Sequence, residues 1–182
     1  MQEVTMHPGG SAEVEQRALQ TVADLICLAA RTAPKARGAD HLVTAVVTGE
    51  AKARLAAEMR AIASAENAAF FARDAANVDA APVVVLLGTR LARYGLPACG
   101  LCGFANCDEN ERAGATCVFP AHDLGIAVGS AAGVAAHHHV DNRVMFSAGV
   151  AALRLGLMGE DVKIAFGLPL SATGKSPFFD RK

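Results

Sequence analysis

The stretch Pro82-Val-Val-Val-Leu-Leu-Gly88 is a continuous apolar run between two residues that interrupt regular structure. Such a run is typical of a central strand that is buried on both faces of a sheet. Residues 42–48 are rich in β-branched side chains and end at Gly49, and residues 162–166 have the same character. These two segments predict further strands.

The segments between these strands carry helical patterns. Apolar residues recur at three- and four-residue steps in several of them, as one buried helix face requires. Strands and helices alternate, but a closing helix pair and an extended tail favour an α+β fold with a mixed sheet over a doubly wound one. We expect one domain over residues 1–182, with helices at 11–30, 50–64, 66–76, 124–136 and 143–157, the second and third of which could be one kinked helix.

Four of the five cysteines lie within nineteen residues, in the spacing C-x2-C-x4-C-x9-C. A [4Fe–4S] cluster takes one ligand per iron and accommodates a compact run with a more distant fourth cysteine. Zinc commonly uses two C-x2-C pairs, and only one is present here. We therefore predict a [4Fe–4S] site within a cysteine-rich loop at 94–120, with zinc as the alternative occupant and a cofactor-free loop as the third possibility. The predicted ligands are Cys99, Cys102, Cys107 and Cys117.

The composition excludes some classes of partner. Apolar residues make up 52% of the 182 residues, mean hydropathy is +0.28, and the formal net charge is −1. The sequence has no stripe of basic residues that would indicate nucleic-acid binding. No apolar run reaches the ~18–20 residues of a membrane span. The N-terminus lacks the pattern of a signal peptide, so we expect a cytoplasmic protein with reduced cysteines. The high apolar content favours an oligomer interface.

The run Cys99-Gly-Leu-Cys-Gly-Phe-Ala-Asn-Cys107 resembles the opening of the [4Fe–4S] domain found in electron-transport complex B subunits and in the corrinoid iron–sulfur protein. Gly100 and Gly103 each follow a cysteine, and glycine allows the tight backbone turns that aim sulfur atoms inward. The resemblance implies an electron-transfer role for the cluster, with a redox partner that the sequence does not identify.

A second resemblance covers most of the chain. Residues 29–38, 123–130, 141–143 and 167–175 resemble an uncharacterised prokaryotic family described as containing a ferredoxin domain, and the order of elements is similar to the nitroreductase-like flavoprotein fold. This resemblance implies a homodimer with FMN at the subunit interface. An FMN phosphate needs cations. The candidates are Arg31, Lys35, Arg37, Lys175 and Arg181.

Three functions remain open at this point. The first is an iron–sulfur electron carrier, the second an FMN-dependent oxidoreductase of nitroreductase type, and the third a zinc-stabilised interaction module.

The predicted helix at 124–136 has several features of its own. Asp123 is a good residue to cap it, and Gly125, Gly129 and Gly133 share one face, which predicts a closely packed neighbour. We interpret His137, His138 and His139 as capping or surface residues, with metal binding as the alternative. His122 is a turn residue or a partner of the cysteine site, and Cys27 is a small core residue.

Overall fold

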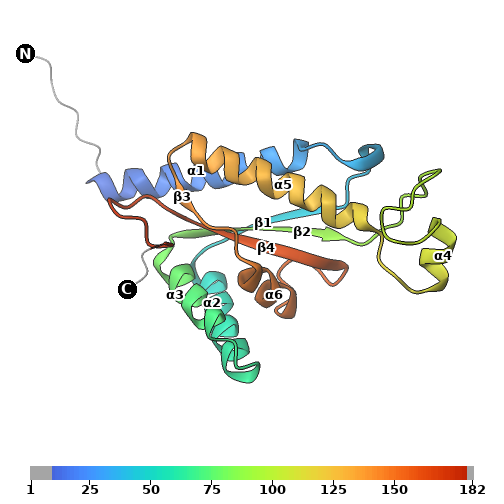
Figure 1. The fold of residues 1–182 in the computed structure, drawn as a ribbon. Helices are drawn as coiled ribbons and strands as arrows, with labels where there is room; N and C mark the ends of the chain where they lie inside the picture. Colours follow the sequence, from blue (N-terminus) through green and yellow to red (C-terminus); the bar gives the residue numbers. More distant parts are fainter. Residues whose placement is uncertain (1–9, 180–182) are drawn as a thin grey trace, which may run out of the picture.

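An antiparallel sheet of four strands lies between two layers of helices in the computed structural model, which describes residues 10–179 (Figure 1). All of its strand pairs are antiparallel. The α+β class is therefore confirmed, whereas the mixed strand direction that we predicted is wrong for the described residues. The strands, in their order across the sheet, are β1 (Leu42–Val47), β2 (Val83–Arg90), β4 (Val162–Ser171) and β3 (Asp141–Asn142).

Each face of the sheet carries its own helices (Figure 1). On one face lie the antiparallel helices α1 (Gly10–Thr32) and α5 (Val118–His137). On the other face lie α2 (Gly49–Ala65), α3 (Ala69–Ala80) and α6 (Phe146–Arg154). The predicted second and third helices are separate, because the chain turns between them at Asn67, which has a positive φ of 51°.

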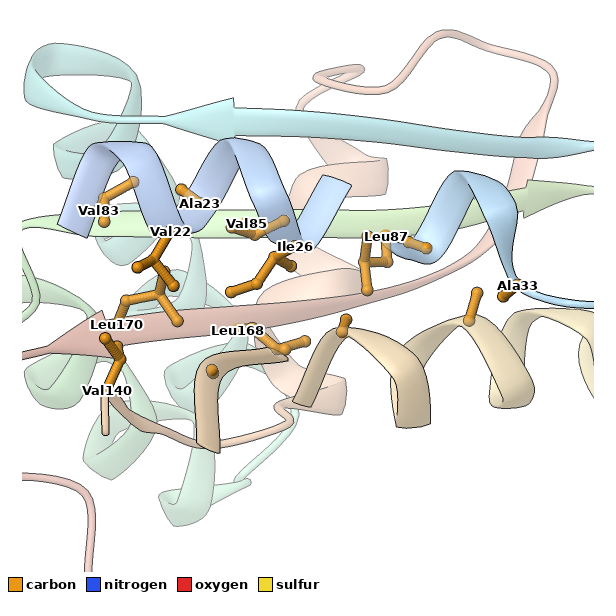
Figure 2. Close-up of a cluster of buried hydrophobic side chains, with 14 of the residues drawn as sticks. Val22, Ala23, Ile26, Ala33, Val83, Val85, Leu87, Val140, Leu168 and Leu170 are labelled. Atoms are coloured by element: carbon orange, nitrogen blue, oxygen red, sulfur yellow. The ribbon is translucent and has the colours of Figure 1, made fainter. Parts of the chain in front are cut away.

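Strand β2 is the centre of both hydrophobic cores, as its apolar sequence predicts. Figure 2 shows Val85 and Leu87 of β2 beside Leu168 of β4 and Ile26 of α1. The alternate residues, Val84 and Leu86, belong to the core on the α2 and α6 side. Side chains alternate between the faces of a strand, so only a strand with helices on both sides needs an uninterrupted apolar run.

Helix α5 begins at Val118, six residues before the start that we predicted. Pro120 lies in its first turn, where the missing N–H has no helical partner to lose. The residue that caps the helix is Cys117. Asp123 lies within the helix, and its side chain is buried. The prediction of Asp123 as the cap is therefore wrong.

The glycine face of α5 points away from the rest of the described chain. A Cβ atom added at Gly125, Gly129 or Gly133 would meet no atom within 4 Å. The closely packed neighbour that we predicted for this face is therefore not found among residues 10–179. The opposite face of α5, which includes Leu124 and Ala127, is buried against α1 and the sheet.

Among the described residues, α5 is also the one helix that is long and apolar enough to cross a membrane by length and composition. We expected no such segment from the sequence. A core helix of a globular domain has the same composition, and α5 packs one face into a core. The observation is therefore weak support for a membrane span.

Candidate functional site

The four predicted cysteine ligands line one cavity, at the end of the sheet where β2 finishes. Cys99 and Cys102 lie in the connection that follows β2, Cys107 is the first residue of the short helix α4 (Cys107–Arg112), and Cys117 caps α5. Figure 1 shows this connection extending beyond the sheet. All four thiols are free and partly buried, so none is consumed in a disulfide.

The donor chemistry of this cavity fits a four-thiolate cofactor, since iron–sulfur clusters and structural zinc both take four cysteines. The side chains are not already arranged around a common centre. Between residues 10 and 179, no group of three or more His, Cys, Asp or Glu side chains is placed to hold a metal ion. The backbone thus gathers the four cysteines at one cavity, and the sulfur atoms would still have to converge on a bound group.

Local turns of the connection place the first three cysteines. Gly103 has a φ of +85°, which glycine adopts without strain, and its N–H donates to the carbonyl of Gly100 at 3.0 Å. Asn106 caps α4 by accepting from the N–H of Glu109 at 2.9 Å, and the Glu109 carboxylate accepts from the N–H of Ala105 at 3.1 Å. These two bonds fix where Cys107 starts the helix.

Tyr94 and Asp123 form a buried pair beside the cysteines. The Tyr94 hydroxyl donates to Asp123 Oδ2 at 2.7 Å, and the N–H of Ala36 donates to Asp123 Oδ1 at 3.1 Å. Burial, then the hydrogen bond to Asp123 and its negative charge, raise the pKa of Tyr94 well above its usual range. The hydroxyl therefore stays protonated and remains a donor. Tyr94 and Phe119, whose rings are in contact, also line the cysteine cavity.

Three of the predicted cations lie together at the end of α1 and at the following turn η1 (Ala36–Gly38): Arg31 is in the last turn of α1, Lys35 caps η1, and Arg37 lies within it. Each is already engaged within the chain. Arg31 donates to Asp40 at 2.5 Å, Lys35 donates to the carbonyl of Ala33 at 2.8 Å, and Arg37 donates to the carbonyl of Tyr94 at 2.5 Å. The Arg37 contact joins this basic turn to the wall of the cysteine cavity.

Of the other two predicted cations, Lys175 does not lie at that turn. Lys175 follows β4, whose last residues pair with the start of β2, whereas the basic turn precedes β1, whose first residues pair with the end of β2. Lys175 therefore follows the end of the sheet opposite to the basic turn. Arg181 lies outside the described residues. Within residues 10–179, one chain therefore brings Arg31, Lys35 and Arg37 together but not Lys175.

The four candidate histidines are exposed at the protein surface. The His122 side chain is 60% exposed, with Nδ1 at 3.6 Å from Asp123 Oδ1 and its ring edge against Phe119. His137, His138 and His139 are exposed at the end of α5, as a capping or surface role requires. Cys27 is partly buried against the core that α1 and α5 form with the sheet, and burial raises the pKa of its thiol.

Several residues of the site escaped the sequence analysis. Tyr94, Phe119, Arg93 and Asn110 line the cavity, but no local motif marks them. Tyr94 is the one tyrosine of the chain, yet its partner Asp123 is distant in sequence, as is Ala36, which also donates to Asp123. Only the folded chain brings these residues together.

The architecture matches solved nitroreductases. The FMN-dependent nitroreductase NfnB from Mycobacterium smegmatis, in complex with NADPH, superposes over 87% of this chain and 81% of its own, with a TM-score of 0.57 and 15% identity. Nitroreductase CinD from Lactococcus lactis, in complex with nicotinic acid, superposes over 88% and 84%, with a TM-score of 0.57 and 17% identity. The chain therefore has the nitroreductase fold, as the order of its elements predicted.

The family follows from two sequence matches. Residues 113–181 match the family described as "Uncharacterized protein containing a ferredoxin domain (DUF2148)". An uncharacterized protein of Archaeoglobus fulgidus is 37% identical over 177 residues, which is 93% of this chain and 95% of the relative. The chain belongs to this family of ferredoxin-domain proteins. The region matched by the family model includes Cys117 but not the other three cysteines of the cavity.

Proposed function

We propose that the protein binds one [4Fe–4S] cluster through Cys99, Cys102, Cys107 and Cys117 and transfers electrons. The observation that carries this proposal is the common cavity, which is lined by all four cysteines although they come from three separate segments. The ferredoxin-domain description of the family agrees with it. When bound, such a cluster accepts and releases one electron at a time.

The chain supplies the environment for that chemistry. Cys117 caps α5, so the partial positive charge at the start of this long helix favours the negative charge of a thiolate-bound group. Tyr94 and Phe119 form an aromatic wall of the cavity and limit the access of water. The hydrogen bonds of Tyr94 to Asp123 and of Arg37 to Tyr94 hold that wall in place.

Anaerobic reconstitution with iron and sulfide tests the proposal. We expect about four iron and four sulfide ions per chain, together with a reducible charge-transfer absorption. Stoichiometric zinc in the protein as it is isolated, with no uptake of sulfide, would contradict the cluster and support the zinc-stabilised interaction module instead. That module also predicts that a chelator unfolds the protein.

An FMN-dependent oxidoreductase is the second candidate, favoured by the fold shared with the FMN-dependent nitroreductase. The basic turn offers Arg31, Lys35 and Arg37, but their hydrogen bonds to the chain would have to be exchanged for a phosphate. Lys175 lies at the other end of the sheet, so it could join them only from a second copy. Flavin fluorescence in the supernatant of denatured protein would support this candidate, and its absence would count against it.

We infer a homodimer, as the resemblance to nitroreductases implies. The open glycine face of α5 and the high apolar content support this inference. Four free thiols at the cavity also suit a reducing compartment, which supports the expected cytoplasmic location.

A further inference from the structure

Arg93 donates hydrogen bonds to three residues between Cys107 and Cys117, and it lines the cysteine cavity. Its Nε donates to Asn110 Oδ1 at 3.0 Å, and one terminal nitrogen donates to Glu111 Oε1 at 3.1 Å. The other terminal nitrogen donates to the carbonyl of Ala115 at 3.3 Å. A single side chain thus joins the strand side of the cavity to α4 and to the turn that leads into α5.

Asn110 is the buried residue through which Arg93 acts. It is 1% exposed, and both ends of its amide have partners, because Nδ2 donates to the carbonyl of Thr116 at 3.3 Å. Its backbone carbonyl accepts from the N–H of Ala115 at 2.9 Å. Asn110 lies one turn after Cys107, and Thr116 directly precedes Cys117. These bonds therefore fix the separation of the two backbone segments that carry the cysteines before any group enters the cavity.

The charge of Arg93 is the second part of the argument. Arginine carries a positive charge, and the side chain of Arg93 is 33% exposed. Its carboxylate partner, Glu111, is 68% exposed, so water and salt screen much of that partner's charge. Arg93 therefore presents positive charge to the cavity. A cluster that gains an electron becomes more negative, so a nearby positive charge stabilises the reduced form more than the oxidised form.

We propose that Arg93 is the positioning residue of the cysteine site: through Asn110 and Ala115 it fixes Cys107 relative to Cys117, and its charge raises the reduction potential of the bound cluster. The inference rests on the proposed iron–sulfur function for its charge effect. The positioning effect involves hydrogen bonds between protein residues alone, so it can be measured without a cluster.

Three variants separate the two effects. Arg93→Gln removes both the charge and the three-point contact, whereas Arg93→Lys keeps the charge but cannot make all three hydrogen bonds. The control is Arg154→Gln, because Arg154 pairs with Glu66 at the same 3.1 Å and lies on α6, away from the cysteines.

Amide hydrogen exchange in cluster-free protein tests the positioning effect. In both Arg93 variants, we expect the Ala115 N–H to exchange about tenfold faster or more, since each loses hydrogen bonds to a charged group. Arg154→Gln should leave this rate unchanged. Wild-type exchange at Ala115 in Arg93→Gln would overturn the inference.

A redox titration of reconstituted protein tests the charge effect. We expect a more negative midpoint potential for Arg93→Gln, a value close to wild type for Arg93→Lys, and no change for Arg154→Gln. Equal potentials for wild type and Arg93→Gln would overturn the charge effect. If the wild-type chain takes up no iron and sulfide, the proposed function fails and the charge effect fails with it, while the exchange result still decides the positioning effect.

Discussion

The hydroxyl of Tyr94 donates a 2.7 Å hydrogen bond to the buried carboxylate of Asp123, and this bond joins the connection after β2 to helix α5. Asp123 also accepts from the N–H of Ala36, so the same carboxylate holds the basic turn. One side chain therefore ties together three segments at the end of the sheet that carries the cysteine cavity.

Tyr94→Phe should destabilise the protein by about 1–3 kcal/mol, because it leaves an oxygen of a buried carboxylate without its partner. The measurement is the free energy of unfolding in urea. The control is Thr21→Val on α1, which removes an exposed hydrogen bond to the carbonyl of Arg17 and should change stability by less than about 0.5 kcal/mol. Equal stabilities for Tyr94→Phe and wild type would show that the pair contributes nothing.

The cysteines give a matched pair of variants. Cys117→Ser should abolish or strongly reduce cluster assembly, because Cys117 lines the cavity, whereas Cys27→Ser should leave the iron content unchanged, because Cys27 lies on α1, packs against the core and does not line the cavity. Iron and sulfide are measured after reconstitution, with circular dichroism to confirm that each variant is folded. Full iron and sulfide in Cys117→Ser would remove this residue from the ligand set.

Gly149 lies where α6 packs directly on β4. A Cβ atom at this position would be 1.8 Å from the carbonyl oxygen of Ala165, a backbone atom that cannot move aside. Gly149→Ala should therefore cost about 1–3 kcal/mol or more of unfolding free energy. The control is Gly174→Ala, where an added Cβ meets nothing within 4 Å and the change should stay within about 0.5 kcal/mol. Similar urea midpoints for the two variants would contradict this close approach.

The sequence predicts much of this fold because its central signals are local. The apolar run of β2 is continuous because helices cover both faces, and the periodicity of α1 reflects one buried face. The start of α5 was misjudged because Asp123 suits a helix cap, and its actual role depends on Tyr94 and Ala36. The antiparallel direction of every described strand pair likewise depends on which distant segments pair, and local sequence patterns do not indicate this.

The site, like the fold, has features that the sequence predicts and features that depend on contacts between distant residues. The spacing of the cysteines predicts a common ligand set, and their common cavity supports that hypothesis. The residues that shape the cavity, such as Arg93 and Asn110, carry no motif, because they act through hydrogen bonds to backbone carbonyls and to each other. Nor did the sequence predict that Arg31, Lys35 and Arg37 would already be bonded within the chain.

The ion pair between Arg31 and Asp40 should give the protein a pH-dependent stability. Burial of the Asp40 carboxyl acts to raise its pKa, but hydrogen bonds from Arg31 and from the N–H of Leu42 outweigh this and hold the pKa below its ordinary value of 3.8. A depressed folded-state pKa stabilises the protein above the unfolded pKa, and that stabilisation is lost as the pH falls through the folded pKa. Asp40→Asn should therefore be less stable than wild type at pH 6, with a difference that shrinks below about pH 4. A difference that is constant from pH 6 to about pH 2 would contradict this assignment.

The exposed glycine face of α5 provides a test of the proposed homodimer. A Cβ atom added at Gly129 would meet nothing within 4 Å in the described chain, so Gly129→Glu should leave the fold of one subunit intact. If a second copy packs on this face, the same change buries a charge without a partner and should dissociate the dimer. The measurement is mass by light scattering, over a range of protein concentration. The control is Gly174→Glu in the tail, where an added Cβ also meets nothing within 4 Å, and which should keep the wild-type mass. A dimer that persists in Gly129→Glu would place the subunit interface elsewhere, and a monomeric wild-type protein would contradict the homodimer itself.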